Sequence, residues 1–420
     1  MNIEICNIKK LINNTKTSNT AYWLIINSIA NAGFGFLYWL IVSRITNPSI
    51  IGSGSTLFSS AILIVSISNI GISEAIIKYM PLYDEKKNTL IVTSVSVVTL
   101  MTILCSIIFI SGIIIWSPVL SSELSKFIPC VIFIFSCIAF SIVSVIDQVF
   151  IALNKPKNIF GRTIIYHITR LIVSLLFHNS GFVLYIAACV GVFASLISAL
   201  FYVVKNIKNV ITWPSAYIAK NIAIYALGNY VANILLAAPG LVLPIIVLNM
   251  MGSESSAYFY IAWTLSSFLF VIPSSFATSL FAEGSRNIME LDDSYNTTKR
   301  ESAIFTISAI IISLFTSKYI LNLFGCFYVE HSYPLLVILN LSAFLVMYNN
   351  LKLVKYRVKR RLDLLIGQSL VVCFITLSLS VLLNKGYGLV GIGIGWIVAQ
   401  ILIAFINVLV EQKKPRRKTC

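Results

Sequence analysis

Long apolar runs separated by short polar gaps make up most of this chain. The runs predict twelve helices, at residues 20–42, 55–77, 89–115, 127–151, 163–178, 182–204, 221–248, 256–281, 302–324, 333–351, 363–383 and 387–409. A helix needs about 20 mainly apolar residues to cross the roughly 30 Å hydrocarbon core of a bilayer. The pattern therefore predicts an all-α polytopic membrane protein with about 12 transmembrane helices.

The composition excludes a soluble protein with a single core. Of the 420 residues, 58% are hydrophobic and 11% are charged, and the mean hydropathy is +0.91. The formal net charge of +16 does not indicate nucleic acid, because the charges form short clusters between the helices and not one basic face. We therefore expect contact with membrane lipids and no nucleic-acid partner.

The basic residues fall in alternate gaps between the predicted helices. These gaps and the two chain ends hold 26 of the 31 lysines and arginines, and basic residues in short loops stay on the cytoplasmic side. The gap after the tenth helix holds the largest group: Lys352, Lys355, Arg357, Lys359, Arg360 and Arg361. We predict a multi-pass protein with both termini in the cytoplasm.

The two halves of the chain show faint similarity. Matches recur at an offset of about 205–207 residues, such as Gly181-Phe182-Val183 against Gly388-Leu389-Val390. Each half holds six helices, so the halves share one orientation, related by a pseudo-twofold axis along the membrane normal. We predict an N-terminal lobe at 1–208, a C-terminal lobe at 209–412 and a basic cytoplasmic tail at 413–420, with binding between the lobes.

Arg170 is the clearest candidate for chemistry inside the membrane, because it lies mid-way along the fifth predicted helix. A charge at that depth is costly and usually faces a polar cavity or a partner. Its planar guanidinium suits an anionic group such as a diphosphate, and the alternative is a structural pair with Asp147 or a backbone carbonyl. Lys318, in the ninth helix, and Arg44, at the outer mouth of the first, would either bind substrate or act as anchors.

Three acids lie near the predicted cytoplasmic ends of helices: Glu74 in the second, Asp147 in the fourth and Glu283 in the eighth. A carboxylate partly shielded from water can carry a coupling proton. The alternative is a salt bridge at the loop edge, with Lys78, Lys155 or Arg286.

Asn31 and Asn233 are candidates for binding hydroxyl-rich ligands such as sugars. Asn27 and Asn31 share one face of the first helix, and Asn229 and Asn233 share one face of the seventh. Hydrogen bonding between helices explains these amides nearly as well.

The sequence favours neither a metal site nor a cofactor. The eight cysteines form no C-x-x-C pair, and most lie in apolar runs. His167, His178 and His331 have no acidic partner at ligand spacing. The G-x-G-x-x-G pattern at 386–391 opens a membrane helix outside any βαβ unit, so it predicts close helix packing and not nucleotide binding.

Four motifs carry a resemblance to a known family. They are Asn31-Ala-Gly-Phe-Gly-Phe, Ile51-Gly52 with Leu57-Phe58-Ser59, Asn69-Ile-Gly71-Ile-Ser73, and Leu153-Asn-Lys155-Pro-Lys157. Together they resemble polysaccharide flippases of the Wzx type, within the multidrug/oligosaccharidyl-lipid/polysaccharide exporter (MOP) superfamily. The resemblance covers essentially the whole chain in helix count and loop lengths.

The resemblance implies two six-helix lobes that alternate between the faces of a bacterial inner membrane. The implied substrate is an undecaprenyl-diphosphate-linked oligosaccharide, an O-antigen repeat unit of lipopolysaccharide biosynthesis, moved from the cytoplasmic to the outer leaflet, often with ion coupling. Basic residues would attract the diphosphate, a role that falls on Arg170 and then on Arg44 and Lys318. A glycan polymerase is an implied partner.

Two other functions stay open. A MATE-like small-molecule antiporter would depend less on cations that bind a diphosphate. A membrane glycan polymerase or glycosyltransferase usually needs a large outer loop or a cytosolic nucleotide-sugar domain, and the short loops disfavour both. We therefore expect a transporter and not an enzyme.

Overall fold

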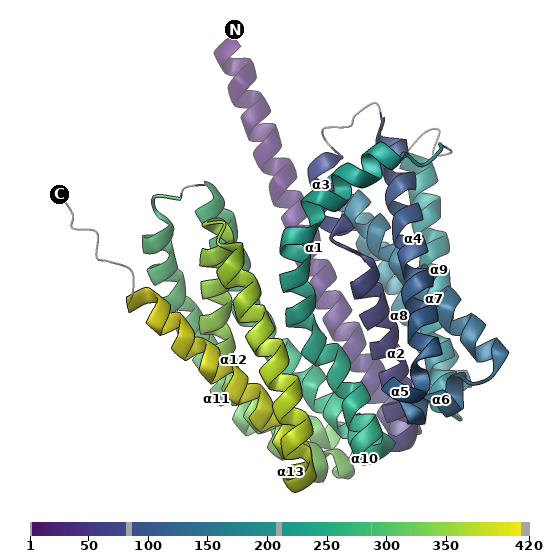
Figure 1. The fold of residues 1–420 in the computed structure, drawn as a ribbon. Helices are drawn as coiled ribbons and strands as arrows, with labels where there is room; N and C mark the ends of the chain where they lie inside the picture. The colour runs from purple at the N-terminus through teal and green to yellow at the C-terminus, as the bar shows by residue number, and fades with distance from the viewer. Residues whose placement is uncertain (1, 81–85, 207–211, 287, 413–420) are drawn as a thin grey trace. The chain divides into compact units, whose positions relative to one another are not determined.

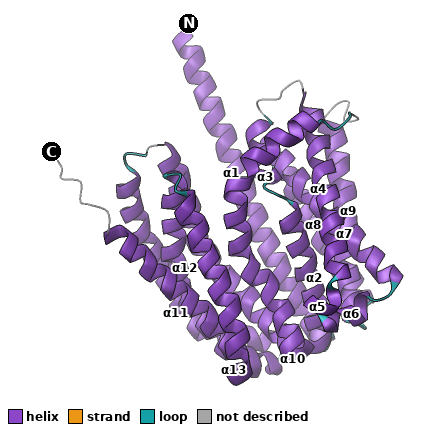
Figure 2. Cartoon of the chain, viewed as in Figure 1, coloured by secondary structure: helices purple, strands orange, loops and turns teal. Residues whose placement is uncertain are grey.

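The computed structural model describes residues 2–80, 86–206, 212–286 and 288–412. Side chains are described from Tyr22 onward, apart from a few inside helices, among them Glu74 and residues 220–229. All regular structure in these ranges is helical (Figure 2). The helices, labelled in Figure 1, are α1 (Asn2–Ile45), α2 (Pro48–Ser68), α3 (Ile72–Tyr79), α4 (Lys87–Ser111), α5 (Ile113–Trp116), α6 (Pro118–Leu124), α7 (Phe127–Ala152), α8 (Lys157–Leu176), α9 (Gly181–Asn206), α10 (Ala216–Arg286), α11 (Leu291–Phe324), α12 (Cys326–Val358) and α13 (Leu362–Gln412).

Ten helical segments of the described chain are long and apolar enough to cross a membrane. Two of them have double length, Tyr230–Ser285 within α10 and the whole of α13. Each contains a glycine that breaks the helix, Gly252 with φ 85° and Gly388 with φ 55°. Positive φ is strained for residues with a Cβ, so glycine suits both breaks. Dividing the two segments there gives twelve spans, and the predicted all-α polytopic membrane fold is confirmed.

The second predicted helix, at 55–77, is wrong in its bounds. Helix α2 begins at Pro48 and ends at Ser68, and α3 starts anew at Ile72. Ile70 and Gly71 between them have positive φ values of 45° and 70°. The Asn69 side chain accepts a hydrogen bond from the backbone N–H of Ser73 at 3.1 Å. Hydropathy does not reveal this break, because Ile67, Ile70 and Ile72 continue the apolar pattern across it.

Three helices extend beyond their apolar runs. Helix α8 begins at Lys157 and not at 163, α11 begins at Leu291 and not at 302, and α12 covers Cys326–Val358, where 333–351 was predicted. Lysine and arginine are good helix formers, so backbone hydrogen bonding continues where the apolar pattern ends. Lys352, Lys355 and Arg357 therefore lie within α12, and their assignment to a loop is wrong.

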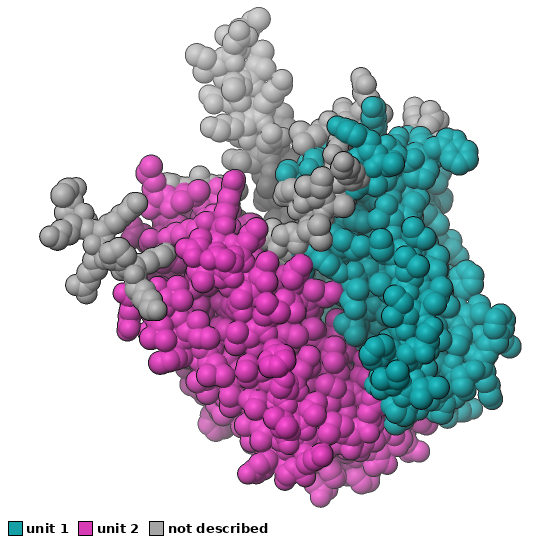
Figure 3. Space-filling view, in the orientation of Figure 1, with its two compact units in different colours: residues 1–46, 57–230 teal, residues 47–56, 231–420 magenta. Residues whose placement is uncertain are grey.

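The chain divides into two compact units (Figure 3). Unit 1 comprises residues 1–46 and 57–230, and unit 2 comprises residues 47–56 and 231–420. The division passes through α2 and α10, so each of these helices contributes to both units. The predicted lobe boundary at 208–209 and the tail at 413–420 lie outside the described residues and stay predictions.

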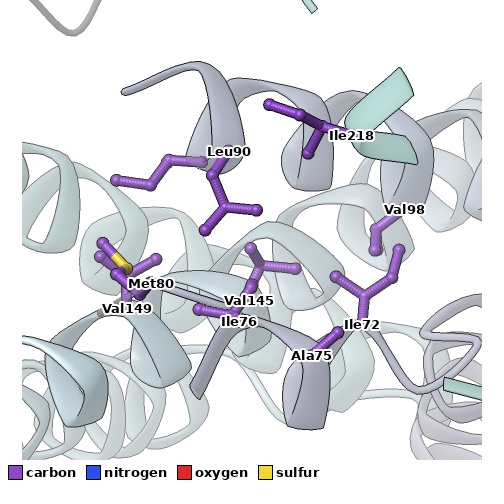
Figure 4. Close-up of a cluster of buried hydrophobic side chains, with 10 residues drawn as sticks. Ile72, Ala75, Ile76, Met80, Leu90, Val98, Val145, Val149 and Ile218 are labelled. Atoms are coloured by element: carbon purple, nitrogen blue, oxygen red, sulfur yellow. The ribbon is translucent and has the colours of Figure 1, made fainter. Parts of the chain in front are cut away.

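In unit 1, α7 packs against α3, α4 and α9, and α8 packs against α1 and α9. The hydrophobic cluster in Figure 4 joins Ile72 and Ile76 of α3, Leu90 of α4 and Val145 of α7. Lipid tails are as apolar as these side chains, so close packing holds such helices together more than the removal of water does. This packing fixes the position of α8 within unit 1, and with it the position of Arg170.

In unit 2, α12 packs against both α11 and α13. The first turns of α2 approach the second half of α10 so closely that a Cβ on Gly52 would clash with the backbone carbonyl of Ser253. One turn further along α2, Thr56 Oγ1 lies 2.9 Å from Ser256 Oγ. Small residues permit such close contact between membrane helices.

We expect Gly52→Ala to destabilise the protein by about 1–3 kcal/mol, because the added methyl group must displace backbone. Gly33→Ala in α1 is the matched control, since a Cβ there has no neighbour within 4 Å and alanine favours the helix. Thermal unfolding in detergent micelles measures both. Equal midpoints for the two variants would show that the α2–α10 contact is not tight.

Candidate functional site

One face of α8 is buried and polar. It carries Thr163, His167, Arg170 and Ser174, spaced three or four residues apart, and all four side chains are buried. This spacing places them on a single stripe along the helix. The sequence therefore directs a line of polar groups, including one permanent charge, into the interior of unit 1.

Aromatic rings surround the Arg170 guanidinium. Its Cζ lies 3.7 Å from the ring centroid of Tyr38, 5.0 Å from Phe58, 5.1 Å from Trp39 and 6.0 Å from Tyr166. The residue is only 4% exposed. The negative faces of aromatic rings attract a cation, and this attraction strengthens when water is excluded. We call Arg170 with these four residues the arginine cage.

A second contact joins α1 and α8 beside the arginine cage. The Asn31 side-chain oxygen lies 3.0 Å from His167 Nε2, and the Phe34 ring stacks on His167 with centroids 5.6 Å apart. On the other side, the Tyr38 hydroxyl lies 3.0 Å from Ser174 Oγ. Two of the predicted binding residues, Arg170 and Asn31, thus lie at the contact between α1 and α8.

The sequence suggested Lys155 or Arg170 as the partner of Asp147. The described ion pair of Asp147 is with neither of them. Both of its carboxylate oxygens accept hydrogen bonds from Arg162, from Nε at 2.7 Å and from Nη2. Such two-point pairing fixes the geometry of both side chains. Arg162, which precedes the predicted helix at 163–178, lies in the second turn of α8.

Three other predicted residues are exposed or make other contacts. Asn233, in unit 2, accepts a hydrogen bond at 3.0 Å from Arg357 Nη2. Lys318 is exposed, and its Nζ lies 4.9 Å from the ring centroid of Tyr333. Arg44 is exposed in the last turn of α1.

The described contacts do not test an ion-coupling role for the two remaining acids, Glu74 and Glu283. Glu283 is exposed and accepts a hydrogen bond at 3.0 Å from Ser294 Oγ. The side chains of Glu74 and Arg286 lie outside the described residues. Their predicted roles stay predictions.

Unit 2 contains a buried charge that the apolar pattern did not predict. Lys352 in α12 is 1% exposed and forms an ion pair with Glu411 near the end of α13. Its Nζ also lies 4.8 Å from the ring centroid of Tyr295. The next basic residue on this face, Lys355, pairs with Asp292 at 2.8 Å. The four-residue spacing of Lys352 and Tyr356 would have indicated a helical face, had α12 been predicted long enough.

A network of amides continues inward from Lys352 and Tyr356. The Tyr356 hydroxyl donates to Asn407 at 2.8 Å, and Asn407 donates to Gln368 at 3.2 Å. One turn before Lys352, Asn349 donates to Gln400 at 2.8 Å. These amides join α12 to both halves of α13, so hydrogen bonds contribute to the association of helices in unit 2.

Comparison with known proteins agrees with this architecture. Residues 18–221 match the model of a family described as "Polysaccharide biosynthesis protein". An inward-facing multidrug resistance MATE family transporter of the MOP superfamily aligns with a TM-score of 0.74 and 12% identity, over 91% of this chain and 94% of that one. The lipid II flippase MurJ, in an inward closed conformation, aligns with a TM-score of 0.76 and 15% identity, over 93% and 88%. The chain has the MOP-superfamily fold.

A third MOP structure supports the same conclusion. A MOP superfamily transporter from Pyrococcus furiosus aligns with a TM-score of 0.60 and 14% identity, over 95% of this chain and 93% of that one. No curated protein matches the sequence. The resemblance to polysaccharide flippases of the MOP superfamily, expected from the motifs, is confirmed. The matched range, residues 18–221, includes the whole arginine cage.

We expect Glu411→Gln to destabilise the protein more than Lys352→Met, by about 2 kcal/mol, because it leaves a buried ammonium without its counterion. Lys352→Met removes the charge and keeps the volume, and Glu411, which is 47% exposed, then meets solvent. Thermal unfolding of both variants and of the double variant in micelles measures the difference. A larger loss for Lys352→Met would show that the lysine stabilises unit 2 through other contacts.

Proposed function

We propose that this protein is a flippase for an undecaprenyl-diphosphate-linked oligosaccharide, an O-antigen repeat unit. It would move this substrate from the cytoplasmic to the outer leaflet of a bacterial inner membrane by alternating access. The match to a polysaccharide biosynthesis family and the fold shared with a lipid II flippase support a lipid-linked glycan as cargo. A glycan polymerase would then receive the product.

The observation that carries the proposal is the arginine cage. Arg170 keeps its charge at any physiological pH and lies in a helix that crosses the membrane. Stacking on Tyr38 engages the face of the guanidinium, whereas a diphosphate would engage its edge. Because Arg170 is buried in this conformation, it would meet the diphosphate in another state of the transport cycle, after α1 and α8 separate.

The residues beside the arginine cage suit the glycan. Asn31 and His167 offer amide and imidazole groups that exchange hydrogen bonds with hydroxyls. Asp147 is the strongest candidate for ion coupling, because protonation of its carboxylate would break the pair with Arg162. Glu74 and Glu283 are weaker candidates, and Arg44, Lys318 and Asn233 would contact substrate only along its path.

The charge pattern supports the orientation. The basic gaps would face the cytoplasm, which places both termini there. A MATE-like antiporter is the second candidate, favoured by the fold shared with a MATE family transporter. It would have less need of the arginine cage, since a small-molecule drug carries no diphosphate.

Depletion of the protein should leave lipid-linked oligosaccharide in the cytoplasmic leaflet. Glycan accessibility in right-side-out and inverted membrane vesicles measures the leaflet. Accumulation of unpolymerised units in the outer leaflet would contradict the flippase and indicate a polymerase. Normal glycan together with lost drug resistance would favour the antiporter.

We expect Arg170→Ala to reduce surface glycan at least about tenfold while the protein stays at its normal level in the membrane. The substitution removes one charge-assisted interaction with the diphosphate, which contributes about 1.5–3 kcal/mol of binding free energy. Arg170→Lys should rescue in part, because it keeps the charge without the planar fork. Lys385→Ala, which removes an exposed cation, is the control and should behave as the unmodified protein. Normal glycan with Arg170→Ala would remove Arg170 from the mechanism.

A further inference from the structure

The two ring nitrogens of His167 in unit 1 differ in their contacts. Nε2 lies 3.0 Å from the side-chain oxygen of Asn31 on α1. An amide oxygen only accepts hydrogen bonds, so Nε2 carries a hydrogen. Nδ1 has no hydrogen-bond partner among the described residues, although the residue is only 6% exposed. A buried polar atom without a partner is rare and calls for a physical explanation.

The charge of Arg170 explains why this ring is neutral in the described conformation. Arg170 follows His167 by three residues on the buried face of α8, and side chains at that spacing are neighbours, with Cβ atoms about 5–6 Å apart. Two positive charges so close repel each other strongly where water is excluded. His167 is therefore the neutral Nε2–H tautomer, and its Nδ1 presents a lone pair that can accept a proton.

Four helices contribute charged or titratable groups around His167 and Arg170, because α8 packs against α1, α7 and α9. These groups are Arg162 and Tyr166 on α8, Tyr38 on α1, Cys189 on α9 and Asp147 on α7. Asp147 is the one carboxylate in this set, and Arg162 occupies both of its oxygens. A protonated His167 would therefore take its counter-charge from a bound anion.

Aromatic rings flank the imidazole as they flank Arg170. The Phe34 ring stacks on His167 with centroids 5.6 Å apart, and the Tyr166 ring meets it edge-on at 4.9 Å. Tyr166 also lies 6.0 Å from Arg170 Cζ, so one ring contacts both groups. The negative faces of aromatic rings attract an imidazolium as well as a guanidinium. The surroundings of His167 thus suit a cation once an anion accompanies it.

We propose that His167 takes up one proton on Nδ1 when the diphosphate of the substrate binds, and that His167 and Arg170 together hold its two phosphates. This role rests on the proposed flippase function and adds to it a second group that recognises the diphosphate. The proton comes from solvent, and no covalent bond of the substrate breaks. Each phosphate of a lipid-linked diphosphate carries about one negative charge and Arg170 supplies one positive charge, so the proton on His167 balances the second phosphate.

Binding should depend on pH, because the complex holds one proton more than the free protein and its affinity rises as pH falls. In the purified full-length protein, His167→Gln should bind undecaprenyl diphosphate about tenfold more weakly than the unmodified protein at about pH 6, and almost equally at about pH 8. Glutamine keeps a hydrogen bond to Asn31 within reach and cannot be protonated. His331→Gln, which changes an exposed histidine of unit 2, is the matched control and should bind as the unmodified protein does.

Calorimetry in two buffers of different protonation enthalpy counts the protons taken up on binding. The unmodified protein should take up about one proton more than His167→Gln. This difference removes the proton uptake of the diphosphate itself, which is common to both titrations.

A second measurement leaves His167 unchanged and so does not depend on the folding of that variant. The sequence contains three histidines, at 167, 178 and 331, so the double variant His178→Gln, His331→Gln keeps His167 alone. Nitrogen NMR spectra of the imidazole distinguish the neutral tautomers from the imidazolium. We expect the neutral Nε2–H form without ligand and the imidazolium with undecaprenyl diphosphate. Phosphatidylglycerol, with a single phosphate, should leave the ring neutral.

The outcomes separate the role of His167 from the function on which it rests. A ring that stays neutral with undecaprenyl diphosphate bound overturns the role of His167 and leaves the flippase standing. Equal proton uptake by His167→Gln and the unmodified protein does the same, and assigns the proton to another group such as Asp147. Protonation by phosphatidylglycerol overturns the selectivity for a diphosphate. If the unmodified protein neither binds undecaprenyl diphosphate nor moves lipid-linked oligosaccharide, the flippase fails and the role of His167 fails with it.

Discussion

A bilayer supplies no water to hydrogen-bond a peptide group, and the described structure is organised by that constraint. Every backbone N–H and C=O inside the membrane needs a partner within the chain, so the spans are helices. Breaks occur where a special residue accommodates them. Gly252 and Gly388 adopt positive φ, and Asn69 bonds to the backbone of the next helix after the turn at Ile70 and Gly71.

The lack of water also makes buried charges costly, and the two units stabilise their buried cations differently. In unit 1, Arg170 lies against aromatic rings, whose negative faces attract a cation. In unit 2, Lys352 lies against a carboxylate. Aromatic rings and a carboxylate both stabilise a buried cation, the rings through their negative faces and the carboxylate through its full charge. Lys352 therefore has a structural partner in unit 2, whereas substrate binding by Arg170 is our proposal.

Polar side chains also connect the helices in both units. The Asn31–His167 contact joins α1 to α8, and the Tyr356–Asn407–Gln368 chain joins α12 to α13. Such bonds are modest in strength, because polar groups find partners in less ordered states too. Helices held by modest bonds and by small-residue contacts, such as the one at Gly52, can separate and repack without breaking covalent or backbone structure. An alternating transporter requires this property.

Hydropathy located the spans well. Each span must match the thickness of the membrane, so each needs a continuous apolar stretch of the right length. It failed at helix ends. The apolar run at 333–351 ends before Lys352, although α12 continues to Val358, because helical hydrogen bonding does not stop where apolar residues do. For the same reason Arg357 was read as a loop residue, although it contacts Asn233 across the bundle.

The all-helical membrane fold, the number of spans and the unusual depth of Arg170 could be predicted from the sequence, because each depends on local composition, and short motifs carried the superfamily resemblance. The partners emerge only from the folded structure: Arg162 for Asp147, His167 for Asn31, and aromatic rings around Arg170. These pairs join helices separated by up to 136 residues along the chain, and the rotation of each helix about its axis decides which side chains meet. That rotation is set by packing between helices, which no single segment of sequence specifies.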